Sequence, residues 1–167
     1  MRQALEQVYW QHRQGLFTLA LAITRRPERA EDAVQDAFAR LFASRARPDG
    51  GDLVPYVFAS VRNAAIDQVR RQDPAVQVTQ TISVFNGLPA DPASDAVTAE
   101  EHRALREALD ALPAEQREAV VMKVYGGLTF DQVARALGEP LQTVASRYRR
   151  ALERLAQRLS GNEGSVP

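Results

Sequence analysis

The spacing of apolar residues predicts three helices in the first part of the chain. The first has two apolar stripes, the second of which holds Trp10, Phe17 and Leu21, so it is expected to be buried on two sides. Pro27 suits the first turn of the second helix, and the third runs from about Val54 to Arg71. The inward positions are Leu5, Val8, Tyr9, Leu16, Leu19, Ala20 and Ile23, then Ala30, Ala33, Val34, Ala37, Phe38, Leu41 and Phe42, then Val54, Val57, Phe58, Val61, Ala65 and Val69.

Two segments interrupt the helical pattern. Residues 44–53 contain Pro, Asp and Gly in turn-forming combinations and are expected to form a loop. Residues 73–98 hold three prolines, an Asn-Gly pair and no basic residue, which indicates a linker and a domain boundary. Within the linker, residues 76–85 are rich in Thr, Val and Ile and are expected to be extended and docked.

The second part of the chain is again helical. Thr98-x-x-Glu101 and Thr129-x-x-Gln132 each have the spacing of a capping box. Between them, a helix from Pro113 to Tyr125 is expected to end at the following glycine pair. After Gly138 a long last helix follows. Its predicted inward residues are Leu141, Val144, Tyr148, Leu152, Leu155 and Leu159, and those of the first helix of this part are Leu105, Ala108, Leu109 and Leu112.

Residues 128–150 have the pattern of a helix-turn-helix. The apolar stripe of its second helix leaves a polar and basic face opposite. Arginine, glutamine and hydroxyl side chains can contact either base edges or phosphates in a DNA groove, and the pattern leaves both kinds of contact open. A solvated basic helix is the alternative that spacing alone allows. The face consists of Gln142, Thr143, Ser146, Arg147 and Arg150.

Charge is distributed unevenly, although the net charge is zero. Residues 73–101 contain five acidic side chains and no basic one, whereas residues 141–160 contain five arginines and one glutamate. This asymmetry favours a nucleic-acid partner for the last helix. The chain has no cysteine, and its beginning lacks a signal-peptide pattern or a long apolar run, so a cytoplasmic location without membrane insertion is expected.

Five stretches together resemble the extracytoplasmic-function sigma factors of the sigma-70 family. Residues 109–117, 125–130 and 143–147 resemble the C-terminal domain of that family. Residues 30–38 resemble its polymerase-docking helix, and residues 56–67 resemble its −10 recognition helix. The motifs occur in the family's order and cover most of the chain outside the linker.

The resemblance implies an all-α fold with two small helical domains joined by a linker, the C-terminal one a helix-turn-helix. Residues 1–72 would bind polymerase and the −10 element, 73–98 would form an acidic linker, and 99–161 would recognise the −35 element. The implied partners are core RNA polymerase, promoter DNA and an anti-sigma factor. The implied contact residues are Asp32, Gln35 and Asp36 for polymerase, Tyr56, Ser60, Arg62, Asn63, Asp67, Arg70 and Arg71 for the −10 element, and Gln142, Thr143, Ser146, Arg147, Arg149 and Arg150 for the −35 element.

The chain departs from the family pattern at several of these positions. Glu139 stands where the family usually has an aliphatic residue, Ala145 where it often has a basic one, and Gln142 where glycine is common. Tyr56 stands where tryptophan is frequent. The departures bear on which promoter sequence is preferred.

Three other functions compete with promoter recognition. A sigma-like decoy that only binds an anti-sigma protein would not need the arginines of the last helix. A lone helix-turn-helix repressor would bind specific DNA without polymerase. Site chemistry argues against an enzyme, because His12 and His102 form no metal-ligand pair and there is no phosphate loop or cysteine nucleophile. Neither a cofactor nor a metal is expected.

Overall fold

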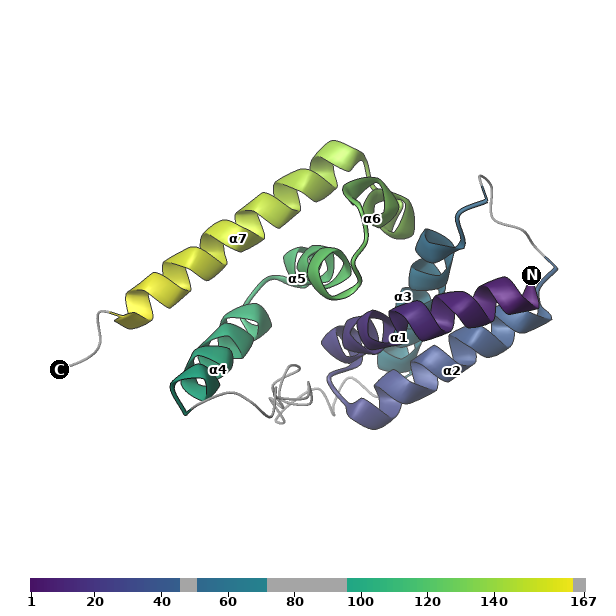
Figure 1. The fold of residues 1–167 in the computed structure, drawn as a ribbon, viewed down its shortest axis with the longest axis horizontal. Helices are drawn as coiled ribbons and strands as arrows, with labels where there is room; N and C mark the ends of the chain where they lie inside the picture. The colour runs from purple at the N-terminus through teal and green to yellow at the C-terminus, as the bar shows by residue number, and fades with distance from the viewer. Residues whose placement is uncertain (46–50, 72–95, 164–167) are drawn as a thin grey trace.

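The described part of the chain is helical throughout (Figure 1). The computed structural model describes residues 1–45, 51–71 and 96–163, and these ranges contain no strand, which confirms the all-α prediction. The elements are α1 (Arg2–Thr24), α2 (Pro27–Ala43), α3 (Leu53–Arg70), α4 (Ala96–Asp110), α5 (Ala114–Val120), the π-helical segment η2 (Val121–Tyr125), α6 (Phe130–Leu137) and α7 (Leu141–Glu163).

Helices α1, α2 and α3 form an N-terminal group. α1 and α2 lie side by side and are joined by a two-residue turn in which Arg25 is left-handed, with φ 57°. Pro27 occupies the first turn of α2, as predicted, because it lacks the N–H that would have no partner there. α3 packs against both helices, and its Phe58 is fully buried between them and the rest of the core. The Asp52 side chain caps α3 by accepting a hydrogen bond from the Val54 N–H at 3.1 Å.

Helices α4 to α7 form a C-terminal group in which one buried arginine joins two helices. Arg117 of α5 donates from Nε to the carbonyl oxygen of Leu109 at 3.3 Å and from Nη2 to those of Asp110 and Leu112 at 2.8 and 2.7 Å. Carbonyl groups at a helix end have no partner within the helix, so Arg117 satisfies the end of α4. Burial lowers the pKa of Arg117, and Arg25 acts in the same direction, but an arginine retains its charge.

The π-helical segment η2 connects α5 to the helix-turn-helix, and the sequence did not predict it. The N–H of Gly126 donates to the carbonyl of Val121 at 2.9 Å, and that of Leu128 to Met122 at 3.1 Å. Gly127 follows with φ 69°, a conformation that suits glycine. The predicted end of this helix at the glycine pair is therefore confirmed, although its last turn is wider than an α-helical turn.

Four predicted inward residues are exposed, and the prediction for them was wrong. Trp10, Phe42, Leu141 and Leu152 have exposed fractions of 65, 40, 49 and 43%. On α7, Ala151 is buried and its neighbour Leu152 is exposed, so the smaller side chain occupies the inward position.

The start of α4 also differs from the prediction. α4 begins at Ala96, so Thr98 lies inside the helix and does not cap it. The helix thus begins within the predicted linker 73–98. Most of that linker, including the predicted extended segment 76–85, lies outside the described residues.

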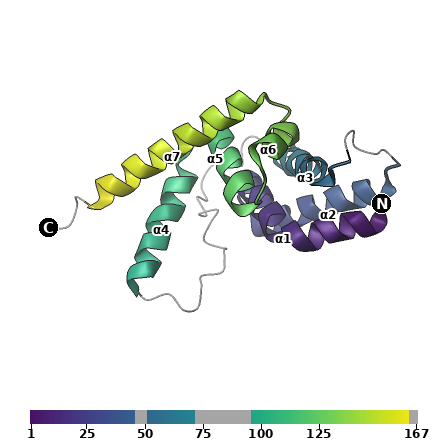
Figure 2. The same cartoon turned by 45° about the horizontal axis from the view of Figure 1, so that its top comes forward.

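The two groups pack against each other. α6 lies against α3, and η2 lies against α1, which both views of the fold show (Figures 1 and 2). Buried residues of both groups belong to one cluster, in which Phe58 of the N-terminal group accompanies Met122, Leu128 and Val133 of the C-terminal group. The described chain is therefore a single packed body.

Replacing Arg117 tests its structural role. We expect Arg117→Met to lower the free energy of unfolding by about 2–4 kcal/mol, because the carbonyl groups at the end of α4 lose a charged donor in a buried place. The measurement is urea unfolding of the full chain. Arg103→Met is the matched control: Arg103 lies on α4, is 64% exposed and forms only surface ion pairs, so its loss should change stability by less than about 1 kcal/mol. Equal losses in the two variants would contradict this role for Arg117.

Candidate nucleic-acid interface

The helix-turn-helix consists of α6, a short turn at Gly138 and α7. The capping box at the start of α6 is confirmed: the Gln132 N–H donates to Thr129 Oγ1 at 3.1 Å, and the Thr129 N–H donates to Gln132 Oε1 at 3.0 Å. Gly138 ends the helix with φ 65°. Phe130 and Tyr148 meet edge to face at 5.2 Å between ring centres, which packs the start of α6 against α7.

The outer face of α7 carries the predicted DNA-contacting residues. Its members lie within an arc of about 160° around the helix axis, with Arg147 and Arg149 at the two edges of that arc. Gln142, Arg149 and Arg150 are exposed, whereas Thr143 and Ser146 are half-buried. Arg149 lies two residues beyond Arg147, about 200° around the helix, so these two arginines cannot face the same part of a groove.

Arg147 differs from the other arginines because two carboxylates hold it. Its Nη2 donates to Glu139 Oε1 at 3.1 Å and lies 3.7 Å from Glu115 Oε2. The Arg147 side chain is only 20% exposed. Both carboxylates meet the same nitrogen, so they leave the Nε and Nη1 donors for another acceptor. Glu139 is one of the residues that depart from the family pattern, and the structure gives it Arg147 as a partner.

The predicted −10 residues on α3 do not form one free surface. Tyr56 packs partly against the core, and the Ser60 hydroxyl donates to the Tyr56 carbonyl at 2.8 Å. Asp67 pairs with Arg40 of α2 at 3.5 Å. Arg62 points toward the C-terminal group and pairs with a glutamate of α5. The residues of this set that are well exposed are Asn63, Arg70 and Arg71.

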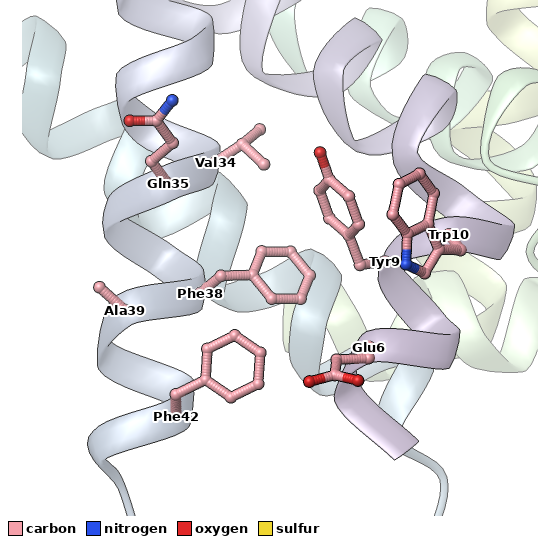
Figure 3. A pocket seen from close by; sticks show the side chains of 8 residues that line it. All are labelled: Glu6, Tyr9, Trp10, Val34, Gln35, Phe38, Ala39 and Phe42. Carbon is pink, nitrogen blue, oxygen red and sulfur yellow. The ribbon is translucent and has the colours of Figure 1, made fainter. Parts of the chain in front are cut away.

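The predicted polymerase-contacting residues lie on α2. Asp32 and Gln35 are exposed, and Asp36 is half-buried. Gln35 also lines a pocket of about 490 Å³ between α1 and α2 (Figure 3). The polar face and this pocket are therefore continuous.

Sequence reasoning missed the pocket because its aromatic residues were expected to be core. The rings of Tyr9 and Phe38 meet edge to face with their centres 5.2 Å apart, and the ring centres of Phe38 and Phe42 are 6.1 Å apart (Figure 3). The ring of Trp10 at the rim is covered by the guanidinium of Arg13 at 5.3 Å. The one available signal was the pair of apolar stripes on a 23-residue helix, since an excess of large apolar residues can mark an exposed patch rather than a core.

The described residues offer no metal centre and no membrane-crossing helix. Within residues 1–45, 51–71 and 96–163, no three His, Cys, Asp or Glu side chains gather in a group that could hold a metal ion. In the same ranges, no helix combines the length and the apolar character needed to cross a bilayer.

Two sequence models of one family match the chain. The model described as Sigma-70 region 2 matches residues 8–74, and the model described as Sigma-70, region 4 matches residues 102–155. The first range contains α2 and α3, and the second contains the helix-turn-helix.

Curated relatives match along nearly the whole chain. The ECF RNA polymerase sigma factor SigK of Mycolicibacterium vanbaalenii is 29% identical over 160 residues, which cover 92% of this chain and 80% of the relative. SigK of Mycobacterium tuberculosis is 28% identical over 159 residues, which cover 91% and 83%.

Two solved structures share the fold. The sigma factor RpoE of Bartonella quintana, determined in complex with the anti-sigma factor NepR, aligns with a TM-score of 0.74 and 25% identity over 94% of this chain and 97% of its own. CnrH, determined in complex with the cytosolic domain of CnrY, aligns with a TM-score of 0.65 and 20% identity over 96% and 90%.

Proposed function

The chain belongs to the extracytoplasmic-function type of the sigma-70 family, and from this premise we propose which of its surfaces bind polymerase and promoter DNA. As a member of that family it directs promoter-specific initiation of transcription by RNA polymerase. The proposed division is residues 1–72 for polymerase and the −10 element, 73–98 as a linker, and 99–161 for the −35 element.

α2 is the proposed polymerase-binding helix. Asp32, Gln35 and Asp36 offer two carboxylates and an amide on one side of the helix, which suits a basic partner surface. The aromatic pocket beside Gln35 adds apolar area that a partner helix can bury. A surface that combines an apolar centre with a charged rim is typical of a specific protein interface.

α3 and α7 are the proposed DNA-binding helices. On α7, Gln142, Thr143, Ser146, Arg147, Arg149 and Arg150 would contact the −35 element in the major groove. On α3, Tyr56, Ser60, Arg62, Asn63, Asp67, Arg70 and Arg71 would contact the −10 element. An aromatic ring with basic neighbours suits unstacked bases of melted DNA.

Arg147 is the arginine we assign to base recognition. Its two carboxylate partners restrict its rotamers, so less conformational entropy is lost when it contacts a base. Arg149 is fully outside such a network and lies on another side of α7, which suits a phosphate contact.

The remaining features of the proposal follow from the role. Nucleotide addition belongs to the polymerase, so we propose that this chain has no catalytic activity and needs no cofactor of its own. Because its proposed partners are polymerase and DNA, we propose that the chain acts in the cytoplasm. An anti-sigma factor is a further proposed partner, since the related RpoE structure is of a sigma factor with such a protein.

The observation that carries the proposal is the order of the two sigma-70 matches, with the basic face of α7 inside the second. The test is transcription of fragmented genomic DNA by sigma-free core polymerase with and without the purified chain, with mapping of RNA 5′ ends. New start sites that share upstream elements are the expected result. A folded chain that gives no new start sites would contradict the proposal and favour a decoy that binds only an anti-sigma protein.

Reversing one charge on α2 tests the polymerase-binding face. Asp36→Arg should weaken binding to core polymerase at least about tenfold, because a cation would face basic groups of the partner. The measurement is a titration of labelled chain with core polymerase. Glu107→Arg on α4 makes the same charge change on an exposed residue of the C-terminal group and should leave affinity unchanged. Unchanged affinity for Asp36→Arg would disprove the assignment.

Two arginine variants separate base contacts from phosphate contacts. Arg147→Ala should reduce discrimination between the preferred −35 sequence and its single-base variants about tenfold at one position. Arg149→Ala should instead weaken binding to all sequences equally and reduce the slope of log affinity against log salt by about 1. Binding of −35 duplexes over a salt series measures both. Equal loss on every sequence for Arg147→Ala would reassign it to phosphate.

A further inference from the structure

We propose that Glu139 is a positioning residue for promoter recognition: its carboxylate orients Arg147 and offsets the charge that Arg147 would otherwise present to DNA of any sequence. The inference rests on the proposed function, which assigns Arg147 to the −35 element. It goes beyond that function by naming a residue in the turn, outside α7, that sets how selective the arginine's contact is.

The turn between α6 and α7 holds the backbone of Glu139 in one place. Gly138 ends α6 with φ 65°, and the N–H of Glu139 then donates to the carbonyl oxygen of Ala134 at 3.1 Å. A hydrogen bond that runs back over the helix end in this way closes a Schellman motif. Beyond the turn, the N–H of Val144 donates to the carbonyl oxygen of Pro140 at 3.1 Å and begins the hydrogen bonding of α7. The Glu139 side chain therefore starts from a point that is fixed relative to both helices of the helix-turn-helix.

A carboxylate is not the usual side chain at this position of the motif. The residue that follows the glycine frequently packs an apolar side chain against the helix that has just ended. The side chain of Glu139 is instead 37% exposed and pairs with Arg147, eight positions further along the chain. The chain thus has an ion pair to α7 at a place where a local apolar contact is common.

Glu139 is the stronger of the two carboxylate partners of Arg147. Arg147 Nη2 donates to Glu139 Oε1 at 3.1 Å, whereas Glu115 Oε2 lies 3.7 Å from the same nitrogen, beyond hydrogen-bond distance. The Glu115 side chain is 74% exposed, so water screens its charge. The Arg147 side chain is only 20% exposed, so its pair with Glu139 is screened less. Glu139 is therefore the residue that restricts the orientation of the guanidinium group.

The nitrogen that Glu139 holds determines which base contacts remain. A guanidinium group contacts guanine through two parallel N–H groups. Its two such pairs are Nε with Nη2 and Nη1 with Nη2, so both pairs use Nη2. Because Glu139 accepts one hydrogen of Nη2 in Arg147, one pair remains intact, and the carboxylate fixes its direction. An arginine that points in one direction accepts fewer base-pair edges than one that rotates freely.

The same carboxylate weakens binding to DNA of the wrong sequence. Phosphates attract an arginine whatever the base sequence, and this attraction supplies most of the non-specific affinity. Glu139 offsets the charge of Arg147 and places a negative charge beside the start of α7, where the proposed function brings phosphates close. The correct base edge still gains a hydrogen bond from the remaining donors. The pair thus lowers affinity for wrong sequences more than for the right one, which raises specificity.

Two substitutions at position 139 separate orientation from charge. Glu139→Leu removes both the acceptor and the charge, and it supplies the apolar side chain that suits the motif. Glu139→Gln keeps an oxygen that can accept a hydrogen bond from Arg147 and removes only the charge. Glu107→Leu is the matched control, because Glu107 is 61% exposed on α4, outside the helix-turn-helix, and its loss changes the net charge equally.

The measurement is binding of the full chain to three kinds of duplex over a salt series: the −35 sequence found by mapping start sites, its single-base variants and a shuffled sequence. Glu139→Leu should bind the shuffled duplex about three- to tenfold more tightly, with a slope of log affinity against log salt that is steeper by about 1. It should also lose discrimination at the base pair that Arg147→Ala identifies. Glu139→Gln should show the same gain in non-specific affinity and retain that discrimination. Glu107→Leu should match the parent chain in both respects.

A double variant tests whether Glu139 acts through Arg147. In an Arg147→Ala background, Glu139→Leu should leave single-base discrimination unchanged, because a positioning residue has no effect without the residue that it positions. An equal loss with and without Arg147 would mean that Glu139 contacts DNA itself, and the positioning role would be wrong. Loss of discrimination in Glu139→Gln as large as in Glu139→Leu would overturn the orienting hydrogen bond.

The remaining outcomes separate this inference from the proposed function. If the parent chain directs initiation at promoters and Glu139→Leu binds every duplex as the parent does, the inference fails and the proposed function stands. If core polymerase with the parent chain initiates at no promoter, the proposed function fails and the role of Glu139 fails with it.

Discussion

The structure depends on the contact between α1 and the π-helical segment η2, where two backbones meet without side chains between them. Gly15 lies inside a 23-residue helix, where glycine costs roughly 1 kcal/mol relative to alanine. Gly126 lies at the point where the chain leaves η2 for the helix-turn-helix. The close approach brings Phe58 against Met122 and Leu128, which gives both groups a shared core. Gly15 therefore lowers the stability of α1 itself, while the close approach it permits lets the two helical groups bury apolar side chains against each other.

This contact also explains why an irregular turn precedes the helix-turn-helix. An α-helical end at Tyr125 would present its last carbonyl groups at a different angle, because a π turn holds one more residue than an α turn. In the wider turn, the carbonyl groups of Val121 and Met122 accept hydrogen bonds from the N–H groups of Gly126 and Leu128. The Gly126 carbonyl group then points toward His12. Burial raises the pKa of Tyr125 within the same segment, as expected for a phenol partly removed from solvent. The position of α6 and α7 thus follows from backbone geometry several residues earlier.

Local features were predictable from the sequence, and long-range ones were not. Helix existence, Pro27 at a helix start and the capping box at Thr129 follow from rules that act within one turn, and all were confirmed. Arg62 and Glu118 are 56 positions apart, and His12 and Gly126 are 114 apart, so no spacing in the sequence indicates that they meet. Gly15 carried the one available signal, since a glycine inside a strong helical pattern often marks a close approach.

The exposed aromatic residues were misjudged for a related reason. Apolar periodicity reports which side of a helix avoids water, but it does not distinguish a core from a surface that a partner covers. Trp10 and Phe42 continue the stripes of α1 and α2 beyond the width that α3 can cover, and they remain at a pocket. The same ambiguity affects charge. Arg62 and Arg147 have the composition of a DNA-binding face, yet each is held by glutamate in the free chain. The pairs differ in where the glutamate lies: Glu139 lies in the same helix-turn-helix as Arg147, whereas Glu118 belongs to the C-terminal group and Arg62 to the N-terminal group. A carboxylate of the first kind orients an arginine, and one of the second kind makes its availability depend on the arrangement of the whole chain.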